Sequence, residues 1–329
     1  MAIDPVPAVD EELAAHCQVV ASRLRRGHVV PFLGAGANLC GRPEAAAWLE
    51  GYLPSGAELA DYLAQEYGYP AGEEKDLLRV SQYVQAVTGG PVLYDELHRL
   101  FAGDYKPTKL HELLALLAGA VASRAHKDAE SRNMLIVTTN YDDALEQAFV
   151  AAGHPFDLVV YMAKGPNRGK FIHRQPGEEP VVIDEPNTYR RLSLEMRPVI
   201  VKIHGAVVRN DRGEDSYVIT EDNYIEYLAQ SDVSNIIPAQ LMAAMNESHF
   251  LFLGYSLKDW NLRVILQRIW GQQAFEDLYM SWAIQKDPSK LEERLWGKRN
   301  VEILDVDLEL YVQVLRDHLF GAGDGVPSW

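Results

Sequence analysis

Cysteine is almost absent from this chain, which has only Cys17 and Cys40 among its 329 residues. Two cysteines are too few for a disulfide framework or for a zinc site with four cysteine ligands, and both suit a reducing compartment. Cys40 lies beside a glycine-rich segment, where we interpret it as a small space-filling residue and not as a nucleophile.

Long apolar runs are absent too. No stretch of about 18 apolar residues is present to span a bilayer. The N-terminal residues MAIDPVPAVDEE carry acidic groups where a signal peptide has basic residues before an apolar stretch. We therefore expect a cytoplasmic protein.

Positive charge is scarce, because 31 Lys and Arg stand against 47 Asp and Glu, giving a formal charge of −16 and a pI near 5.0. Such a chain repels a phosphate backbone at long range, so direct nucleic-acid binding is not expected. Hydrophobic residues make up 47% of the chain. This is enough for a sizeable core, as one large domain or as a domain with an insertion.

Short apolar runs alternate with helical patterns, which predicts a mainly parallel, doubly wound, Rossmann-like α/β sheet. Apolar residues at helical spacing predict an N-terminal helix within residues 1–27, followed by one domain over 28–320 and a tail over 321–329. The predicted strands of the parallel sheet are Val29–Leu33, Met134–Thr139, Phe156–Tyr161, Val199–Ile203, Phe250–Leu253, Tyr279–Ile284 and Val301–Val306.

Helical patterns from about residue 55 to residue 130 separate the first predicted strand from the second. They open with a capping box, in which Ser55 is followed three positions later by Glu58. We expect a helical insertion beside the sheet. An ordinary dinucleotide-binding fold has a second strand that ends on an acidic residue about 20 positions after the glycines. No such strand is predicted here, which disfavours an ordinary dehydrogenase.

Two irregular segments interrupt the second half of the chain. Ala163–Arg197 is rich in Gly, Pro and charge and has short β-like pieces, so we interpret it as a loop or a small β-excursion near the ligand. Val207–Ile219 is expected to form a hairpin whose turn lies at Asn210–Asp215.

Four predicted strands end on small or polar residues. The carboxyl ends of parallel strands share one edge of the sheet, where ligands bind, so we expect the four endings to face one crevice. Each also has a purely structural explanation, because tight turns use glycine, Asn caps helices and His before Gly suits a turn. In the functional interpretation, glycines without Cβ atoms let backbone N–H groups approach a phosphate. The endings are Gly34-Ala35-Gly36, Thr138-Thr139-Asn140-Tyr141-Asp142, Lys202-Ile203-His204-Gly205 and Leu253-Gly254-Tyr255-Ser256.

The four endings in this order resemble the sirtuin family, in particular the bacterial sirtuin-like NAD-consuming proteins of antiphage defence. The resemblance spans residues from about 25 to 270. It implies NAD as the substrate, a glycine loop on the pyrophosphate, and an Asn and a His at the nicotinamide-ribose end. The catalytic residues implied are Asn140, His204 and Asp142, and the cofactor-binding residues are Gly34, Ala35, Gly36, Asn38, Thr139, Gly254 and Ser256. Asp142 is expected to orient Asn140 or a ribose hydroxyl.

Two departures from the family pattern put protein deacylation in doubt. Deacylating sirtuins carry a zinc ribbon with four cysteines, which two cysteines cannot build. They also grip nicotinamide with a Gly-Ile-Pro-Asp-Phe-Arg stretch, and the nearest segment here, Gly41-Arg42-Pro43-Glu44, lacks the Asp and the Phe. The prediction is therefore an NAD⁺ glycohydrolase that releases nicotinamide and ADP-ribose. The alternatives are an NAD-dependent deacylase or ADP-ribosyltransferase, and a non-catalytic module that senses NAD or ADP-ribose.

The residue types suit this hydrolysis. Nicotinamide leaves as a neutral molecule, so no strong general acid is needed, while positive charge grows on the ribose. An Asn amide can fix a hydroxyl group or the water, and a neutral His can take the released proton. No metal site is predicted: His111-Glu112 opens a string that lacks the second His of a zinc-protease helix and belongs to a Leu-rich core helix.

Regulation is expected as well, because an uncontrolled NADase would drain its own cell. The resemblance implies an abortive-infection antiphage effector that depletes NAD. We expect gating by assembly into a homo-oligomer or by a separate partner protein such as a HerA-type ATPase.

Overall fold

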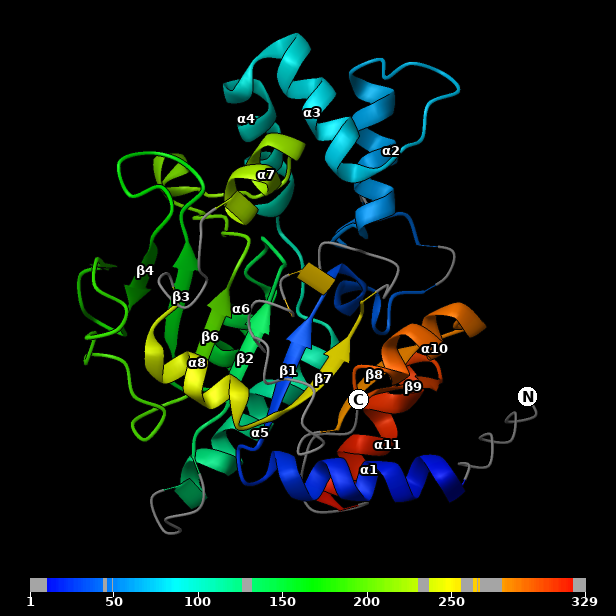
Figure 1. The fold of residues 1–329 in the computed structure, drawn as a ribbon, viewed down its shortest axis with the longest axis vertical. Coiled ribbons are helices and arrows are strands. Elements are labelled where there is room, and N and C mark those ends of the chain that lie inside the picture. The colour runs from blue at the N-terminus through cyan, green and yellow to red at the C-terminus, as the bar shows by residue number, and fades with distance from the viewer. Residues whose placement is uncertain are drawn as a thin grey trace.

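A nine-stranded sheet forms the framework of the protein, in the order β5-β4-β3-β6-β2-β1-β7-β8-β9 (Figure 1). The structure is a computed structural model that describes residues 11–43, 46–48, 50–125, 132–229, 237–255, 263–264, 266 and 280–321. The seven consecutive strands β3, β6, β2, β1, β7, β8 and β9 run parallel to one another. At the other side of β3, β4 is antiparallel to both its neighbours, β3 and β5. The strands are β1 (Val29–Leu33), β2 (Leu135–Thr138), β3 (Asp157–Tyr161), β4 (Phe171–Arg174), β5 (Val181–Ile183), β6 (Val199–Lys202), β7 (His249–Leu253), β8 (Ser281–Gln285) and β9 (Val301–Asp305).

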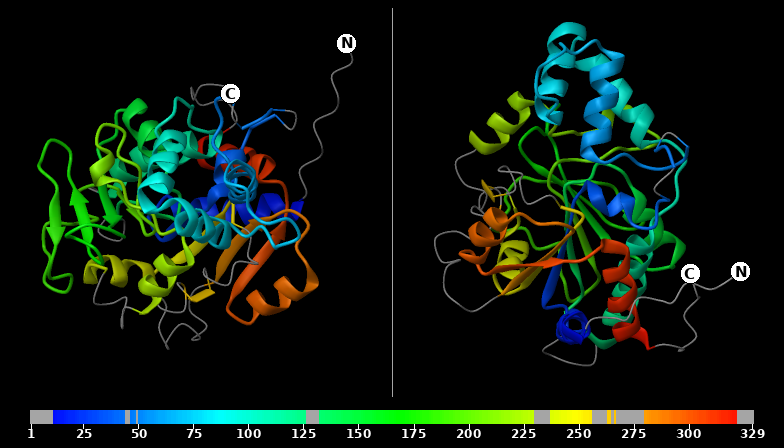
Figure 2. Two further views of the ribbon diagram at one scale, coloured as in Figure 1. Left: turned by 90° about the horizontal axis from the view of Figure 1, so that it is seen from above. Right: turned by 90° about the vertical axis from the view of Figure 1, so that its right-hand side faces the viewer.

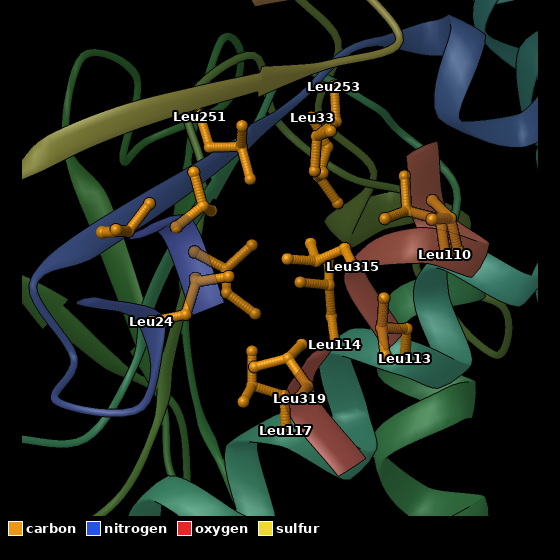
Figure 3. Packing of buried hydrophobic residues seen from close by; sticks show 14 of the residues in the cluster. Leu24, Leu33, Leu110, Leu113, Leu114, Leu117, Leu251, Leu253, Leu315 and Leu319 are labelled. Atoms are coloured by element: carbon orange, nitrogen blue, oxygen red, sulfur yellow. The ribbon is translucent and has the colours of Figure 1, made fainter. Parts of the chain in front are cut away.

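Both faces of the sheet are covered by helices, so successive strand residues pack into two different cores. In β1, Val30 and Phe32 belong to one cluster, whereas Val29 and Leu33 belong to the other. This is why the parallel strands read as continuous apolar runs and not as alternating ones. The first cluster includes residues of α7 (Glu221–Ala229), α8 (Ala239–Asn246) and α10 (Lys290–Gly297). The second, drawn in Figure 3, includes residues of α1 (Glu11–Leu24), α5 (Lys109–Ala125), α6 (Ala144–Ala151) and α11 (Leu308–Phe320).

The predicted fold class is confirmed: the structure has a mainly parallel sheet with helices on both faces. The β-excursion expected in Ala163–Arg197 corresponds to β4 and β5, which extend the sheet at one edge. The helix predicted through Leu262 and Ile269 lies largely outside the described residues. None of the helices in the described part of the chain is long and apolar enough to cross a membrane.

Three helices between β1 and β2 stand beyond the carboxyl ends of the central strands (Figures 1 and 2). They are α2 (Gly56–Glu66), α3 (Leu77–Thr88) and α4 (Gly90–Phe101), and we call them the helical insertion. The predicted insertion, from about residue 55 to residue 130, also includes α5. This helix differs from the other three because it packs on a face of the sheet against α6 and α11. The capping box forms at the start of α2, where Ser55 Oγ accepts from Glu58 N and Glu58 Oε2 accepts from Ser55 N.

The insertion is joined to the loops at the sheet edge by a third apolar cluster. This cluster combines insertion residues such as Leu97 and Phe101 with Tyr141 after β2 and with Tyr217. The Tyr141 ring lies 5.4 Å from the Phe101 ring and 5.3 Å from the Tyr217 ring, measured between centroids. The insertion is therefore packed directly onto the loop that follows β2.

The hairpin expected at Val207–Ile219 does not form strands. Two backbone hydrogen bonds join its arms, since Val218 N donates to His204 O and Ser216 N donates to Ala206 O, each over 2.9 Å. The ladder ends there because the next two ladder N–H groups donate within the turn. Val208 N donates to Asp215 Oδ1 at 2.7 Å, and Glu214 N donates to Asp211 O at 3.1 Å. Val207 N faces away from the partner arm and donates to Tyr141 O at 2.8 Å.

Candidate functional site

The four predicted strand endings lie side by side, because β6, β2, β1 and β7 are consecutive in the sheet. All four strands are parallel, so their carboxyl ends share one edge, and this edge faces the helical insertion (Figure 1). The chain order reverses between β1 and β7, since β2 lies on one side of β1 and β7 to β9 lie on the other. Doubly wound sheets bind ligands at such a switch point.

The glycine turn after β1 packs backbone against backbone on the loop after β7. Gly34 N donates to Leu253 O at 3.0 Å, and Gly36 N donates to Gly254 O at 2.9 Å. A Cβ atom on either glycine of the turn would lie 2.7 Å from Gly254 O. The glycines are therefore required for this close approach. Their own N–H groups are used by β7 and its loop, which differs from the expectation that these N–H groups approach a phosphate.

Replacing Gly254 by alanine is expected to destabilise the protein more than the matched change Gly153→Ala. Both glycines have φ of +70°, so both variants carry the same left-handed strain. A Cβ on Gly254 would lie 2.0 Å from Ala37 N, whereas a Cβ on Gly153 meets nothing within 4 Å. We expect this overpacking to make Gly254→Ala less stable than Gly153→Ala by about 1 to 3 kcal/mol. Urea unfolding of the two variants measures the difference in their unfolding free energies. Equal losses of stability in the two variants would show that the backbone at Ala37 can move to accommodate the added Cβ.

Asn140 lies directly above the glycine turn, on the loop that follows β2. Its backbone N–H donates to Thr138 Oγ1 at 3.0 Å, and its side-chain Nδ2 donates to Gly34 O at 3.2 Å. Thr139 N donates to Leu33 O, and Thr139 Oγ1 lies 2.5 Å from the Tyr255 hydroxyl. The loops after β1, β2 and β7 are thus held together by a continuous set of hydrogen bonds.

Asn38 and Asp142 form a buried pair beside this turn, with 4% and 3% of their surfaces exposed. Asn38 Nδ2 donates to Asp142 Oδ2 at 2.9 Å, and Ala144 N donates to Asp142 Oδ1 at 3.1 Å. Asp142 therefore orients Asn38, whereas Asn140 is held by Gly34 O. Asn38 Oδ1 is buried and has no hydrogen-bond partner.

His204 is the buried histidine of the loop after β6. Its Nδ1 shares a hydrogen bond of 3.2 Å with the Tyr224 hydroxyl of α7, and its Nε2 is buried without a partner. Burial lowers the pKa of His204 to about 3, so the imidazole is neutral at neutral pH. A neutral imidazole does not oppose positive charge that develops nearby, and its free nitrogen can bind a hydroxyl group or a water molecule.

The depressed pKa of His204 predicts a loss of folding stability in acid. In the unfolded chain this histidine titrates near 6.5, whereas the folded protein takes up the proton only near pH 3. The unfolded state binds more protons between these values, so this contribution is present above pH 6.5 and is lost as the pH falls toward 3. His204→Gln removes it. We expect the unfolding free energy of this variant to depend less steeply on pH between 6.5 and 4 than that of the wild type, and equal slopes would contradict the burial.

Several residues at this edge were not predicted as site residues. Tyr255 and Tyr224 hold Thr139 and His204. Tyr255 lies in the predicted ending after β7, but its contact could not be predicted because its partner lies 116 positions away, and Tyr224 lies outside the four endings. His111, assigned to a core helix, has its pKa lowered to about 4 by burial, with opposing charge effects from Asp142 and Lys202. Ser256 lies outside the described residues.

A family model described as the SIR2-like domain matches residues 134–304, which is more than half of the chain. The chain belongs to the SIR2-like family. The matched range includes the loops after β2, β6 and β7, and the glycine turn after β1 precedes it. No curated protein matches the chain. SIR2-like domains are typically NAD-using enzymes, so the family gives this protein an NAD-related function with NAD as its substrate.

The SIR2-like site has buried polar atoms without protein partners, and these atoms suit the hydroxyl groups of NAD. Asn38 Oδ1 and His204 Nε2 are both buried and lack partners, and they belong to loops on either side of the Asn140 loop. A buried polar atom without a protein partner can be satisfied by a ligand or a water molecule, and these two atoms lie at the edge where a ligand of the sheet binds. Ribose hydroxyl groups donate and accept the hydrogen bonds that these atoms lack. Among the residues described, no group of three or more His, Cys, Asp or Glu is placed to hold a metal ion.

Proposed function

We propose that this SIR2-like protein is an NAD⁺ glycohydrolase. The observation that carries the proposal is the placement of a neutral, buried histidine and an anchored asparagine after the neighbouring strands β6 and β2, at the same sheet edge as the switch point. The reaction breaks the bond between the nicotinamide nitrogen and C1′ of the ribose. Water adds to C1′, and the products are nicotinamide, ADP-ribose and one proton.

Each residue of the site has a role in this reaction. Asn140, whose Nδ2 is fixed on Gly34 O, holds a ribose hydroxyl or the attacking water. His204 receives a hydrogen bond from the water through Nε2 and, being neutral, does not oppose the positive charge on the ribose. The Asp142 carboxylate places negative charge at the same edge, which favours that positive charge.

Hydrolysis is favoured over deacylation by the cysteines. Cys17 and Cys40 are the two cysteines of the chain, and both are buried within the same apolar cluster. Burial raises the pKa of each thiol to about 12, so neither is a ready thiolate for zinc. This supports a site that transfers the ADP-ribose group to water.

We further propose that the enzyme acts in antiphage defence by depleting NAD. Unregulated hydrolysis would harm the host cell, so activity is expected to depend on assembly into a homo-oligomer or on a partner such as a HerA-type ATPase. Measuring the rate across a range of protein concentrations, with and without the products of neighbouring genes, tests this dependence.

Product analysis distinguishes the candidate activities. Incubating the purified protein with NAD alone should release nicotinamide and ADP-ribose in equal amounts. A deacylase consumes NAD only when an acylated peptide is added, and an ADP-ribosyltransferase leaves ADP-ribose on protein. A sensing module binds NAD without any turnover. Any of these three results in place of free ADP-ribose would contradict the proposal.

A further inference from the structure

Lys202 is a buried lysine at the sheet edge that carries the candidate site. It is the last residue of β6, pairs with Thr138 of β2, and has 1% of its surface exposed. The three residues before it in β6 are Val199, Ile200 and Val201, which shows that apolar side chains suit the buried positions of this strand. Burying a lysine is unfavourable unless its donors are paired. Its presence here therefore calls for a reason other than packing.

The ammonium group of Lys202 binds the backbone of the loop that carries Asn140 and Asp142. Nζ donates to Asp142 O, lies 3.5 Å from Tyr141 O, and donates to Glu146 Oε1 of α6 at 2.8 Å. The side chains of Lys202 and Glu146 are 1% and 13% exposed. The lysine thus connects the end of β6, the loop after β2 and the first turn of α6.

The ion pair itself is a weak explanation for retaining the lysine. Replacing both members of a buried pair by uncharged residues is often neutral for stability, whereas removing one member leaves an unpaired buried charge. A pair of uncharged residues would not reproduce the contacts from Lys202 Nζ to the carbonyl groups of Tyr141 and Asp142. These carbonyls belong to the residues that directly follow Asn140.

We propose that Lys202 is a positioning residue, which holds the Tyr141 and Asp142 carbonyl groups and so places Asn140 and the Asp142 carboxylate for reaction. The inference rests on the proposed function, because the reaction in question is NAD hydrolysis. Lys202 does not touch the substrate in this account. Misplacing a catalytic group by about 1 Å lowers a rate by about 10²-fold, so loss of the lysine contacts should affect kcat.

The double variant Lys202→Met, Glu146→Gln separates positioning from stability. It leaves no unpaired buried charge, so its thermal midpoint should stay close to that of the wild type. We expect kcat to fall by about 10- to 100-fold with KM little changed. Amide hydrogen exchange in residues 140–144 should become faster, while exchange in β7 should not. Glu146→Gln alone should lower the thermal midpoint, because it leaves the buried Lys202 charge unpaired, but it keeps the carbonyl contacts of the lysine and should retain slow exchange in residues 140–144.

Wild-type kcat and wild-type exchange in the double variant would overturn the inference and leave the proposed function standing. If the wild-type protein does not hydrolyse NAD, the proposed function fails. Hydrogen exchange in residues 140–144 of the double variant then decides whether Lys202 holds the loop, because this measurement does not depend on turnover. Faster exchange supports the role of Lys202, and unchanged exchange contradicts it. The single variant Lys202→Met should unfold at a lower temperature than the double variant, since it leaves Glu146 without its partner.

Discussion

Replacing Asn140 by alanine is expected to lower kcat for NAD hydrolysis by about 10²- to 10³-fold, the usual effect of removing one preorganised polar group from a reaction centre. The asparagine amide is anchored by Gly34 O, so its orientation is set before any substrate binds. Alanine removes the group that holds the ribose hydroxyl or the water. The initial rate of nicotinamide release at saturating NAD measures the effect.

Asn133 provides the matched control for this prediction. It is a fully buried asparagine directly before Met134 and β2, at the end of the strand opposite Asn140, and neither of its side-chain polar atoms has a hydrogen-bond partner. Asn133→Ala therefore changes a buried asparagine beside the same strand, at its other end, without touching the candidate site. Its kcat should equal that of the wild type. Full activity in Asn140→Ala would remove Asn140 from the reaction centre.

Replacing His204 by alanine is expected to lower kcat by about 10²- to 10³-fold, the usual effect of removing one preorganised hydrogen-bonding group from a reaction centre. Because the pKa of His204 is lowered by burial to about 3, the histidine is already neutral across the usual assay range. Lowering the pH from 8 to 5 should therefore not reduce the wild-type rate through protonation of His204 in the free enzyme. A plot of log kcat/KM against pH measures this.

His173 is the matched control for His204. It is a fully buried histidine on β4 whose Nδ1 shares a hydrogen bond of 2.8 Å with the Tyr189 hydroxyl, and it lies near Asp157 at the start of β3. It pairs with Val159 of β3, and β3 separates it from β6 and from the loop that carries His204. We expect His173→Gln to change stability but not kcat. Equal losses of activity in the two histidine variants would show that His204 acts only by supporting the fold.

Much of the sheet could be predicted because each central strand is a short apolar run that ends at a glycine or a polar residue. The strands ending before Gly34, Asn140, His204 and Gly254 were placed from this pattern, and the parallel order then brings the four endings to one edge. Fully buried strands lack the alternation of exposed strands, so their ends are marked by where the apolar residues stop.

The contacts within the site could not be predicted, because they join residues far apart in the chain. Gly36 is needed for its approach to Gly254, and Asn38 binds Asp142 across 104 positions. The partner of each group depends on which strands are neighbours, which no local pattern encodes. The hairpin prediction failed for a local reason, since Asp215 Oδ1 takes the Val208 N–H that a hairpin ladder would use.

The proposed reaction requires one dinucleotide to lie across neighbouring strand ends, and a crystal structure of the protein with ADP-ribose tests this most directly. We expect the diphosphate beside the glycine turn, at the switch point between β1 and β7. The ribose should then lie within hydrogen-bonding distance of Asn140 and His204. ADP-ribose bound away from this edge, or in contact with neither residue, would contradict the account.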